Sequence, residues 1–289
     1  GLEYLDQSVT SSTPYEQTGR TVKSAFAGYQ GDYGPHALQL NARRDDNSQY
    51  GGQSTGSAGY SYRFDSGLRA RASAGTAFKA PTFNDLYFPD LAPFFFSNPN
   101  LLPERSRSKE AGVDYDGAKQ YFSATLFRND ITDLITVYTD PSTFVSTTQN
   151  LNSARIEGLE LAWRGELPGW QTRAQLTVQD PRDEMTGAQL RRRAKHYGSL
   201  SAGRKFGDLR LGAELVGTGA RFDSTNEAPN TRMHGYGLIN LTANYPFAKE
   251  WSLNARWNNV FDRDYELVQF FNTPGSNVLV WVAWQPQKP

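Results

Sequence analysis

The sequence predicts an all-β fold, a transmembrane up-and-down antiparallel β-barrel with about 14 strands in these 289 residues. Three observations lead to this prediction: segments that alternate apolar and polar residues, connections that alternate in length, and aromatic residues gathered beside the short connections. Aromatic residues make up 13% of the chain, which favours strands. The mean hydropathy of −0.63 is compatible with a barrel, because only every second strand residue faces lipid.

The alternation is clearest at 251–258, where Trp251, Leu253 and Trp257 alternate with Asn254 and Arg256. Side chains on a strand point to opposite faces in turn, so such a segment has one apolar face and one polar face. The same pattern recurs at 68–75, 172–179, 209–215 and 237–244.

Arginines decide which face looks outward. They lie on the polar faces of their segments, where a water-filled lumen accommodates them, whereas an arginine facing lipid at mid-membrane costs about 2–4 kcal/mol. The residues concerned are Arg69, Arg71, Arg173, Arg210 and Arg256. A soluble sandwich would turn its apolar faces inward, so these arginines favour the membrane barrel with its apolar faces outward.

Short and long connections alternate along the chain, as expected for a barrel with tight turns at one rim and long loops at the other. The short turns are predicted at 31–35, 65–67, 116–119, 167–169, 205–208 and 246–249. The long loops are predicted at 9–20, 44–53, 79–107, 129–152, 180–193, 220–232 and 262–276.

Aromatic side chains lie close to the short turns, which predicts a girdle at the level of the lipid headgroups. The residues expected in this girdle are Tyr29, Tyr33, Tyr60, Tyr62, Phe64, Tyr115, Tyr121, Phe122, Trp163, Trp170, Phe206, Tyr245, Phe247, Trp251 and Trp284.

Several motifs resemble the TonB-dependent outer-membrane receptors of Gram-negative bacteria, and among them the vitamin B12 (cobalamin) receptors. The motifs are "RRDDNSQYG" at 43–51, "AGTAFKAPTFNDLYFP" at 74–89, "NPNLLPERSRSKEAGVDY" at 98–115, "FRNDITDLI" at 127–135, "NSARIEGLEL" at 152–161, "LRRRAKH" at 190–196, "NNVFDRDYE" at 258–266 and "NTPGS" at 272–276. "DDNSQYG" and "NTPG" resemble the cobalamin branch in particular.

The resemblance implies a parent barrel of about 22 strands, filled by an N-terminal plug and preceded by a box that binds TonB. Residues 1–289 would be a single β-barrel domain, the C-terminal part of such a receptor, without plug or box. We expect the bacterial outer membrane as its location, with both ends of the chain on the periplasmic side. We also expect the first and last strands to pair and close a smaller barrel, since closure removes exposed edges.

Exposed aromatic residues in the loop after residue 78 are the candidate contacts of a large, partly apolar ligand. They are Phe83, Tyr87, Phe88, Phe94, Phe95 and Phe96, joined by Asn272 and Thr273 from the last long loop. The alternative is that these aromatic rings pack against neighbouring loops as a lid.

No metal site or catalytic site is predicted. Asp45, Asp46 and Asn47 could offer oxygens to Ca²⁺, a possible cofactor of the full-length receptor by resemblance, but a hairpin turn explains them more simply. The G-x-S-x-G string at 52–56 lacks the helix that a nucleophile elbow requires. His36, His196 and His234 lack metal-ligand spacing.

The resemblance implies a non-enzymatic receptor that binds cobalamin or a related corrinoid and imports it with energy delivered by TonB. TonB would act through N-terminal residues outside this sequence. Alternatives are a receptor for a ferric siderophore, a passive porin, or an outer-membrane hydrolase. Thirty Lys and Arg residues balance thirty Asp and Glu residues, so nucleic acid is not an expected partner. Arg191, Arg192 and Arg193 are expected to pair with lipopolysaccharide phosphates or with nearby loop carboxylates such as Asp183 and Glu184.

Overall fold

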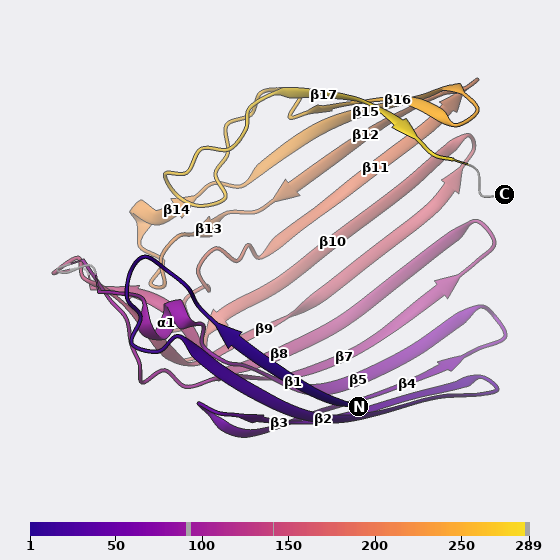
Figure 1. The fold of residues 1–289 in the computed structure, drawn as a ribbon. Coiled ribbons are helices and arrows are strands. Elements are labelled where there is room, and N and C mark those ends of the chain that lie inside the picture. The colour runs from indigo at the N-terminus through magenta and orange to yellow at the C-terminus, as the bar shows by residue number, and fades with distance from the viewer. Residues whose placement is uncertain (91–93, 141, 287–289) are drawn as a thin grey trace.

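The computed structural model describes residues 1–90, 94–140 and 142–286 as one curved antiparallel sheet with loops at both rims (Figure 1). Consecutive strands of the sheet are hydrogen-bonded neighbours throughout, which is the predicted up-and-down order. The sheet comprises β1 (Leu2–Ser8), β2 (Gly19–Tyr33), β3 (His36–Asn47), β4 (Gly51–Arg63), β5 (Leu68–Lys79), β7 (Glu104–Asp116), β8 (Gln120–Thr139), β9 (Ser146–Leu167), β10 (Trp170–Asp183), β11 (His196–Phe206), β12 (Leu209–Thr218), β15 (Tyr236–Ala248), β16 (Trp251–Asn258) and β17 (Asn277–Trp284).

The short elements lie in the loops of one rim. Strand β6 (Phe95–Phe96) pairs in parallel with the start of β9, and β13 (Arg221–Phe222) pairs with β14 (Arg232–Met233). Helix α1 (Phe83–Tyr87) and the 3₁₀ helix η1 (Pro229–Thr231) are the helical turns in the described part of the chain. No helix there is long and apolar enough to cross a bilayer.

The registers confirm that the polar and apolar residues of the strands lie on opposite faces. Arg69 pairs with Asp114, which is 3% exposed on the inner face, while the next pair, Leu68 and Tyr115, points outward. On the outer face, Leu126 is 63% exposed. The buried hydrophobic residues of the described chain gather in the long loops and strand ends rather than in a dry centre of the sheet.

Tight hairpins form one rim of the sheet, and the predicted aromatic girdle lies beside them. Gly34 (φ 59°) and Gly169 (φ 78°) adopt left-handed backbone conformations that suit glycine at two of these turns. At the outer face of the same rim, the Arg204 guanidinium lies 5.7 Å from the centre of the Trp170 ring and 5.2 Å from that of Phe206. Tyr121 departs from the prediction, because its register with Asp116 and Arg164 turns it inward.

The sheet is open, so the prediction of a closed smaller barrel is wrong for this structure. Within the described residues β1 pairs with β2 and β17 with β16, and the two outermost strands do not pair with each other (Figure 1). Barrel diameter grows with strand number, so a sheet with the curvature of a wider barrel leaves its two edges apart.

The two ends of the sheet lie at different heights. Trp284 at the end of β17 pairs with Trp251, beside the short turn that links β15 and β16. Leu2 at the start of β1 instead pairs with Ala25, well before the end of β2 at Tyr33. Trp284 therefore lies at the short-turn rim, whereas β1 begins partway along β2 and runs toward the long loop at 9–18. The periplasmic location of both ends stays a prediction.

Two predicted long loops are shorter than expected, because the flanking strands extend into them. Strands β3 and β4 are joined by residues 48–50 alone, so connection lengths do not alternate strictly. Asn47 starts this turn by accepting hydrogen bonds from the backbone N–H groups of Gln49 and Tyr50. Likewise, β8 and β9 extend until residues 140–145 remain between them.

Candidate ligand site at the long-loop rim

Helix α1 anchors the first group of predicted site residues. Its first turn is held by a capping box in which Thr82 Oγ1 accepts from the backbone N–H of Asp85 and the Asp85 carboxylate accepts from that of Thr82. Leu86, Tyr87 and Leu101 are buried and form a small apolar cluster at this rim. The Tyr87 hydroxyl accepts a hydrogen bond from Gln49 and donates one to Gln17, so this ring is a packed residue of the loops.

The neighbouring rings Phe83 and Phe88 also pack against other loop residues. Phe83 lies against the buried cluster, with the Arg20 guanidinium 5.0 Å from its ring centre. Phe88 makes edge-to-face contacts with Tyr15 at 6.3 Å and Phe95 at 5.9 Å between ring centres. These contacts correspond to the lid arrangement described as the alternative to ligand binding.

Phe94 and Phe96 remain open to solvent, with 69% and 38% of their surfaces exposed. The reason is local: Phe95 and Phe96 form β6, whose successive side chains point to opposite sides. Phe95 turns toward Phe88, and its neighbour turns away. The structure thus separates the predicted aromatic group into packed rings and two exposed rings.

Asn272 and Thr273 line a second part of the rim, a hollow of about 630 Å³ between β14, the start of β15 and the last long loop. The Tyr236 and Tyr265 rings, 4.6 Å apart between centres, form part of its wall. The Thr273 hydroxyl donates to the carbonyl oxygen of Tyr265 at 2.6 Å, which fixes the loop against this wall.

Beside that hollow lies a buried cation that the sequence analysis missed. Arg221 is 5% exposed, and its guanidinium lies 5.6 Å from the ring centre of Tyr236. Its Nη2 donates to the carbonyl oxygen of Glu266, while its Nη1 is buried without a hydrogen-bond partner, and it makes no ion pair with any described residue. A buried guanidinium without an anion is costly, which makes this position chemically suited to an anionic or carbonyl-rich group.

The last long loop also exposes aromatic residues that were not predicted. Phe261 is 74%, Phe270 86% and Phe271 70% exposed. Phe270 has a positive φ of 67°, unusual for a bulky residue, and its backbone N–H donates to the Glu266 carboxylate. Adjacent Phe residues within an otherwise polar loop were the signal in the sequence.

Asp223 clamps three loops together. It accepts hydrogen bonds from the side chains of Arg191 and Arg192 and from the backbone N–H of Gln269. Burial raises the pKa of Asp223, but the hydrogen bonds from Arg192, Gln269 and Arg191 outweigh it, so the pKa lies below its ordinary value.

A loop carboxylate pairs with the first two arginines of the run at 191–193, but it is Asp223 and not the named candidates Asp183 and Glu184. Asp183 accepts hydrogen bonds from the backbone N–H groups of Met185 and Thr186, and Glu184 pairs with Arg155 at 2.7 Å. Asp223 is distant in the sequence, so the chain order carried no indication of this pairing.

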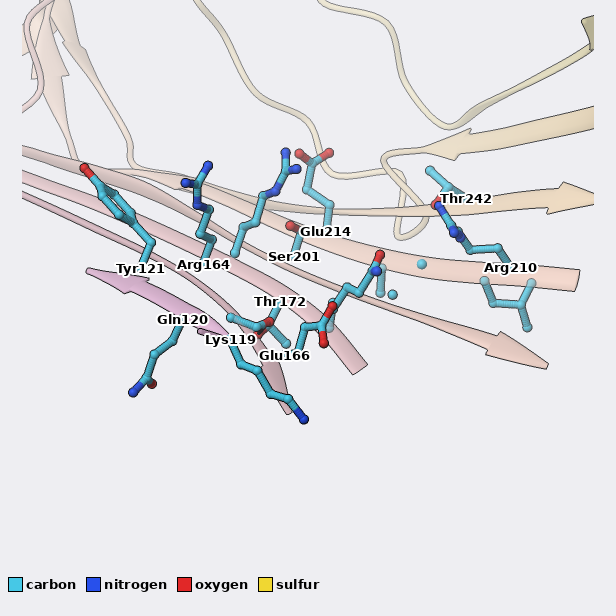
Figure 2. A pocket seen from close by; sticks show the side chains of 18 of the residues that line it. Lys119, Gln120, Tyr121, Arg164, Glu166, Thr172, Ser201, Arg210, Glu214 and Thr242 are labelled. Atoms are coloured by element: carbon cyan, nitrogen blue, oxygen red, sulfur yellow. Dashed lines mark hydrogen bonds between the residues drawn. The ribbon is translucent and has the colours of Figure 1, made fainter. Parts of the chain in front are cut away.

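The inner wall of the sheet is polar and charged nearer the short-turn rim. A hollow of about 780 Å³ is lined by residues of β7 to β16, and Figure 2 shows Tyr121, Arg164 and Glu214 projecting from it on the same side. Glu214 pairs with Arg256 at 2.7 Å and accepts a hydrogen bond from Asn240. Such a wall suits a water-filled lumen and provides no apolar pocket.

The hairpin predicted at 45–47 is present, but Asp45 and Asp46 lie within β3 and the turn itself comprises residues 48–50. The Asp45 carboxylate accepts hydrogen bonds from Ser24 and Arg43, and Asn47 caps the turn. No group of three or more His, Cys, Asp or Glu residues in the described parts of the chain is arranged to hold a metal. The G-x-S-x-G string lies inside β4, with β5 following, so the nucleophile-elbow geometry is absent at this place.

Comparison with known proteins places this architecture in a family. The family described as "TonB dependent receptor-like, beta-barrel" matches residues 2–260. The chain is 31% identical over 266 residues to the vitamin B12 transporter BtuB of Vibrio vulnificus (strain YJ016), covering 91% of this chain and 42% of that protein.

Solved structures agree in fold at low sequence identity. The siderophore receptor PirA from Acinetobacter baumannii superposes with a TM-score of 0.76 at 16% identity, over 98% of this chain and 51% of that one. The copper transporter OprC gives 0.77 at 19% identity, over 92% of this chain and 48% of that one. The chain thus spans about half the length of these proteins, and it belongs to the TonB-dependent receptor β-barrel family.

Proposed function

We propose that the receptor containing this barrel binds cobalamin, or a related corrinoid, at the cell surface and imports it with energy delivered by TonB. The observation that carries the proposal is the 31% identity to the vitamin B12 transporter BtuB across 91% of the chain. The structural similarities to siderophore and copper receptors lie at 16–19% identity and support the fold alone.

The long-loop rim has the chemistry that such a ligand requires. The exposed rings of Phe94, Phe96 and Phe270 offer apolar contacts to a broad, flat macrocycle. Asn272 and Thr273 offer polar contacts in the neighbouring hollow. In this proposal Phe83, Tyr87, Phe88 and Phe95 act mainly by packing the loops that carry the exposed rings.

The proposed mechanism is capture followed by gated passage, in which no covalent bond is made or broken. Residues 1–289 would act as one barrel domain of a longer outer-membrane receptor, and TonB would engage a segment outside these residues. Phosphorylated lipids of the outer leaflet would surround the apolar outer face.

Binding of cyanocobalamin to the full-length receptor, measured by titration calorimetry, tests the proposal. We expect the double substitution Phe94→Ala and Phe96→Ala to weaken binding about tenfold or more, because exposed aromatic anchors commonly carry binding energy. Phe64→Ala is the matched control, since Phe64 is 47% exposed at the short-turn rim, away from the long loops.

A ferric siderophore provides the competing ligand in the same titration. Binding of the ferric siderophore with no binding of cyanocobalamin would overturn the proposed substrate while leaving the receptor family intact. If cyanocobalamin binds and the double substitution has no effect, the substrate stands and the two rings are not part of its site.

A further inference from the structure

Two arginines face each other on the inner wall of the sheet, near the short-turn rim. Arg164 on β9 and Arg173 on β10 are direct register partners, and both line the hollow of about 780 Å³. Both side chains are exposed. Like charges that lie directly opposite each other on antiparallel strands repel. The pair therefore requires a nearby anion.

No carboxylate in the described parts of the chain supplies that anion. Neither arginine side chain has an ion pair or a hydrogen bond with a described residue. Glu214 lies in the same inner row, but it pairs with Arg256 at 2.7 Å and accepts a hydrogen bond from Asn240. Asp116 and Glu166 also line the hollow, and neither forms an ion pair with a described cation.

The neighbours of the pair hold it in place and add a donor. The Arg164 guanidinium lies 4.7 Å from the ring centre of Tyr121 on β8, and Figure 2 shows these two side chains next to each other. The Tyr121 hydroxyl donates to the Asp114 carboxylate, which orients the ring. On the other side, Ser201 of β11 is the register partner of Arg173, and its hydroxyl has no hydrogen-bond partner among the described residues. Two guanidinium groups and a hydroxyl thus lie side by side in one inner row.

This set of donors fits a phosphate group. Guanidinium groups bind phosphate oxygens through paired N–H donors, so two of them on adjacent strands engage several oxygens of one phosphate. A corrinoid with a nucleotide loop carries such a group, a phosphodiester. Pores that pass phosphate are lined by Arg and Lys, and their contacts must be weak enough for release. Exposed arginines on a water-filled wall meet this condition.

The pair lies far from the loops of the proposed capture site. Strand β10 runs from Trp170 at the short turn to Asp183 at the long-loop rim. Arg173 is ten residues before Asp183, a separation of about 33 Å along the strand. A ligand captured at the long loops therefore meets the two arginines only after it has left them.

We propose that Arg164 and Arg173 form a site in the lumen that binds the phosphodiester of the ligand during its passage toward the short-turn rim. The inference rests on the proposed function, because the corrinoid supplies the phosphodiester. The site favours passage of corrinoids that carry this group over those that lack it.

Uptake of radiolabelled cyanocobalamin and cobinamide tests the site, in cells whose only cobalamin receptor is the full-length protein. Cobinamide lacks the nucleotide loop and its phosphodiester. We expect Arg164→Gln with Arg173→Gln to lower the initial rate of cyanocobalamin uptake at least about fivefold and that of cobinamide less than about twofold. Cyanocobalamin binding at the cell surface should be unchanged, which also shows that the variant is folded.

Two further variants sharpen the measurement. Arg164→Lys with Arg173→Lys keeps both charges and should retain most of the cyanocobalamin uptake. The matched control, Arg107→Gln with Lys109→Gln, removes two exposed cations from the outward face of β7 and should transport both corrinoids at the wild-type rate.

Three outcomes would overturn this inference while wild-type uptake upholds the proposed function. Unchanged cyanocobalamin uptake by the Gln variant would remove the site. An equal loss of cobinamide uptake would assign the arginines to the internal structure of the receptor. Excess inorganic phosphate that abolishes the difference between wild type and variant would assign the site to free phosphate. A wild-type receptor that takes up neither corrinoid would instead overturn the proposed function, and this inference with it.

Discussion

On the inner face of the sheet, Arg69 and Arg71 converge on the buried carboxylate of Asp114, which also accepts hydrogen bonds from Ser123 and Tyr121. Arg71 also donates to the Thr125 hydroxyl on the adjacent strand β8, and the next residue, Leu126, stands exposed on the outer face with no polar partner. One backbone step therefore separates a site that requires charge compensation from one that requires a hydrocarbon surrounding. The comparison teaches that each strand carries residues suited to water on one face and residues suited to lipid on the other.

The largest effect is expected when an arginine is placed on the outer face of β10 and compared with an arginine placed on its inner face. We expect Leu176→Arg, on the outer face, to lower the free energy of unfolding by about 2–4 kcal/mol, because the charge meets lipid near mid-membrane. Gln175→Arg, one residue away on the inner face, should cost less than 1 kcal/mol. Urea unfolding of the barrel in lipid vesicles measures both. Equal losses for the two variants would contradict the assignment of the faces.

A smaller effect is expected from removing the inner carboxylate. Asp114→Asn leaves Arg69 and Arg71, which pair with it at 2.7 and 3.2 Å, without their anion. Both arginines are partly exposed to the lumen, so we expect a loss of only about 1–2 kcal/mol. Asp116→Asn, an exposed carboxylate on the same strand, is the control and should be neutral in the same unfolding measurement. An unchanged stability of the Asp114 variant would show that water already replaces the ion pairs.

The smallest effect concerns the Asp223 clamp and is confined to the loops. The pKa of Asp223 is lower in the folded state, so its contribution is complete above the unfolded pKa of about 3.9 and is lost as pH falls through the lower folded value. We expect the protection factor of the Gln269 amide to fall as pH drops through the lowered folded pKa of Asp223, with the inner-face strands unchanged. Asp223→Asn should exchange fast at every pH. A Gln269 amide that exchanges at the same rate in both proteins would exclude the clamp.

Much of the fold could be predicted because its signals are local. A period of two along a strand decides which residues share a face, so Leu176 and Arg173 are separated by their positions alone. Turn residues such as Gly34 and Gly169 mark the short rim in the same way. The candidate site was less predictable, since Tyr87 is packed and Phe94 exposed although both lie in one aromatic-rich loop.

By itself, then, the sequence determined the strand order, the two faces and the turn rim, since each follows from neighbours within a few residues. Only the tertiary structure decided that the sheet stays open, that Asp223 rather than Asp183 holds Arg191, and that Arg221 is buried without an anion. These features depend on sheet curvature and on contacts between loops distant in the chain, which no local pattern specifies.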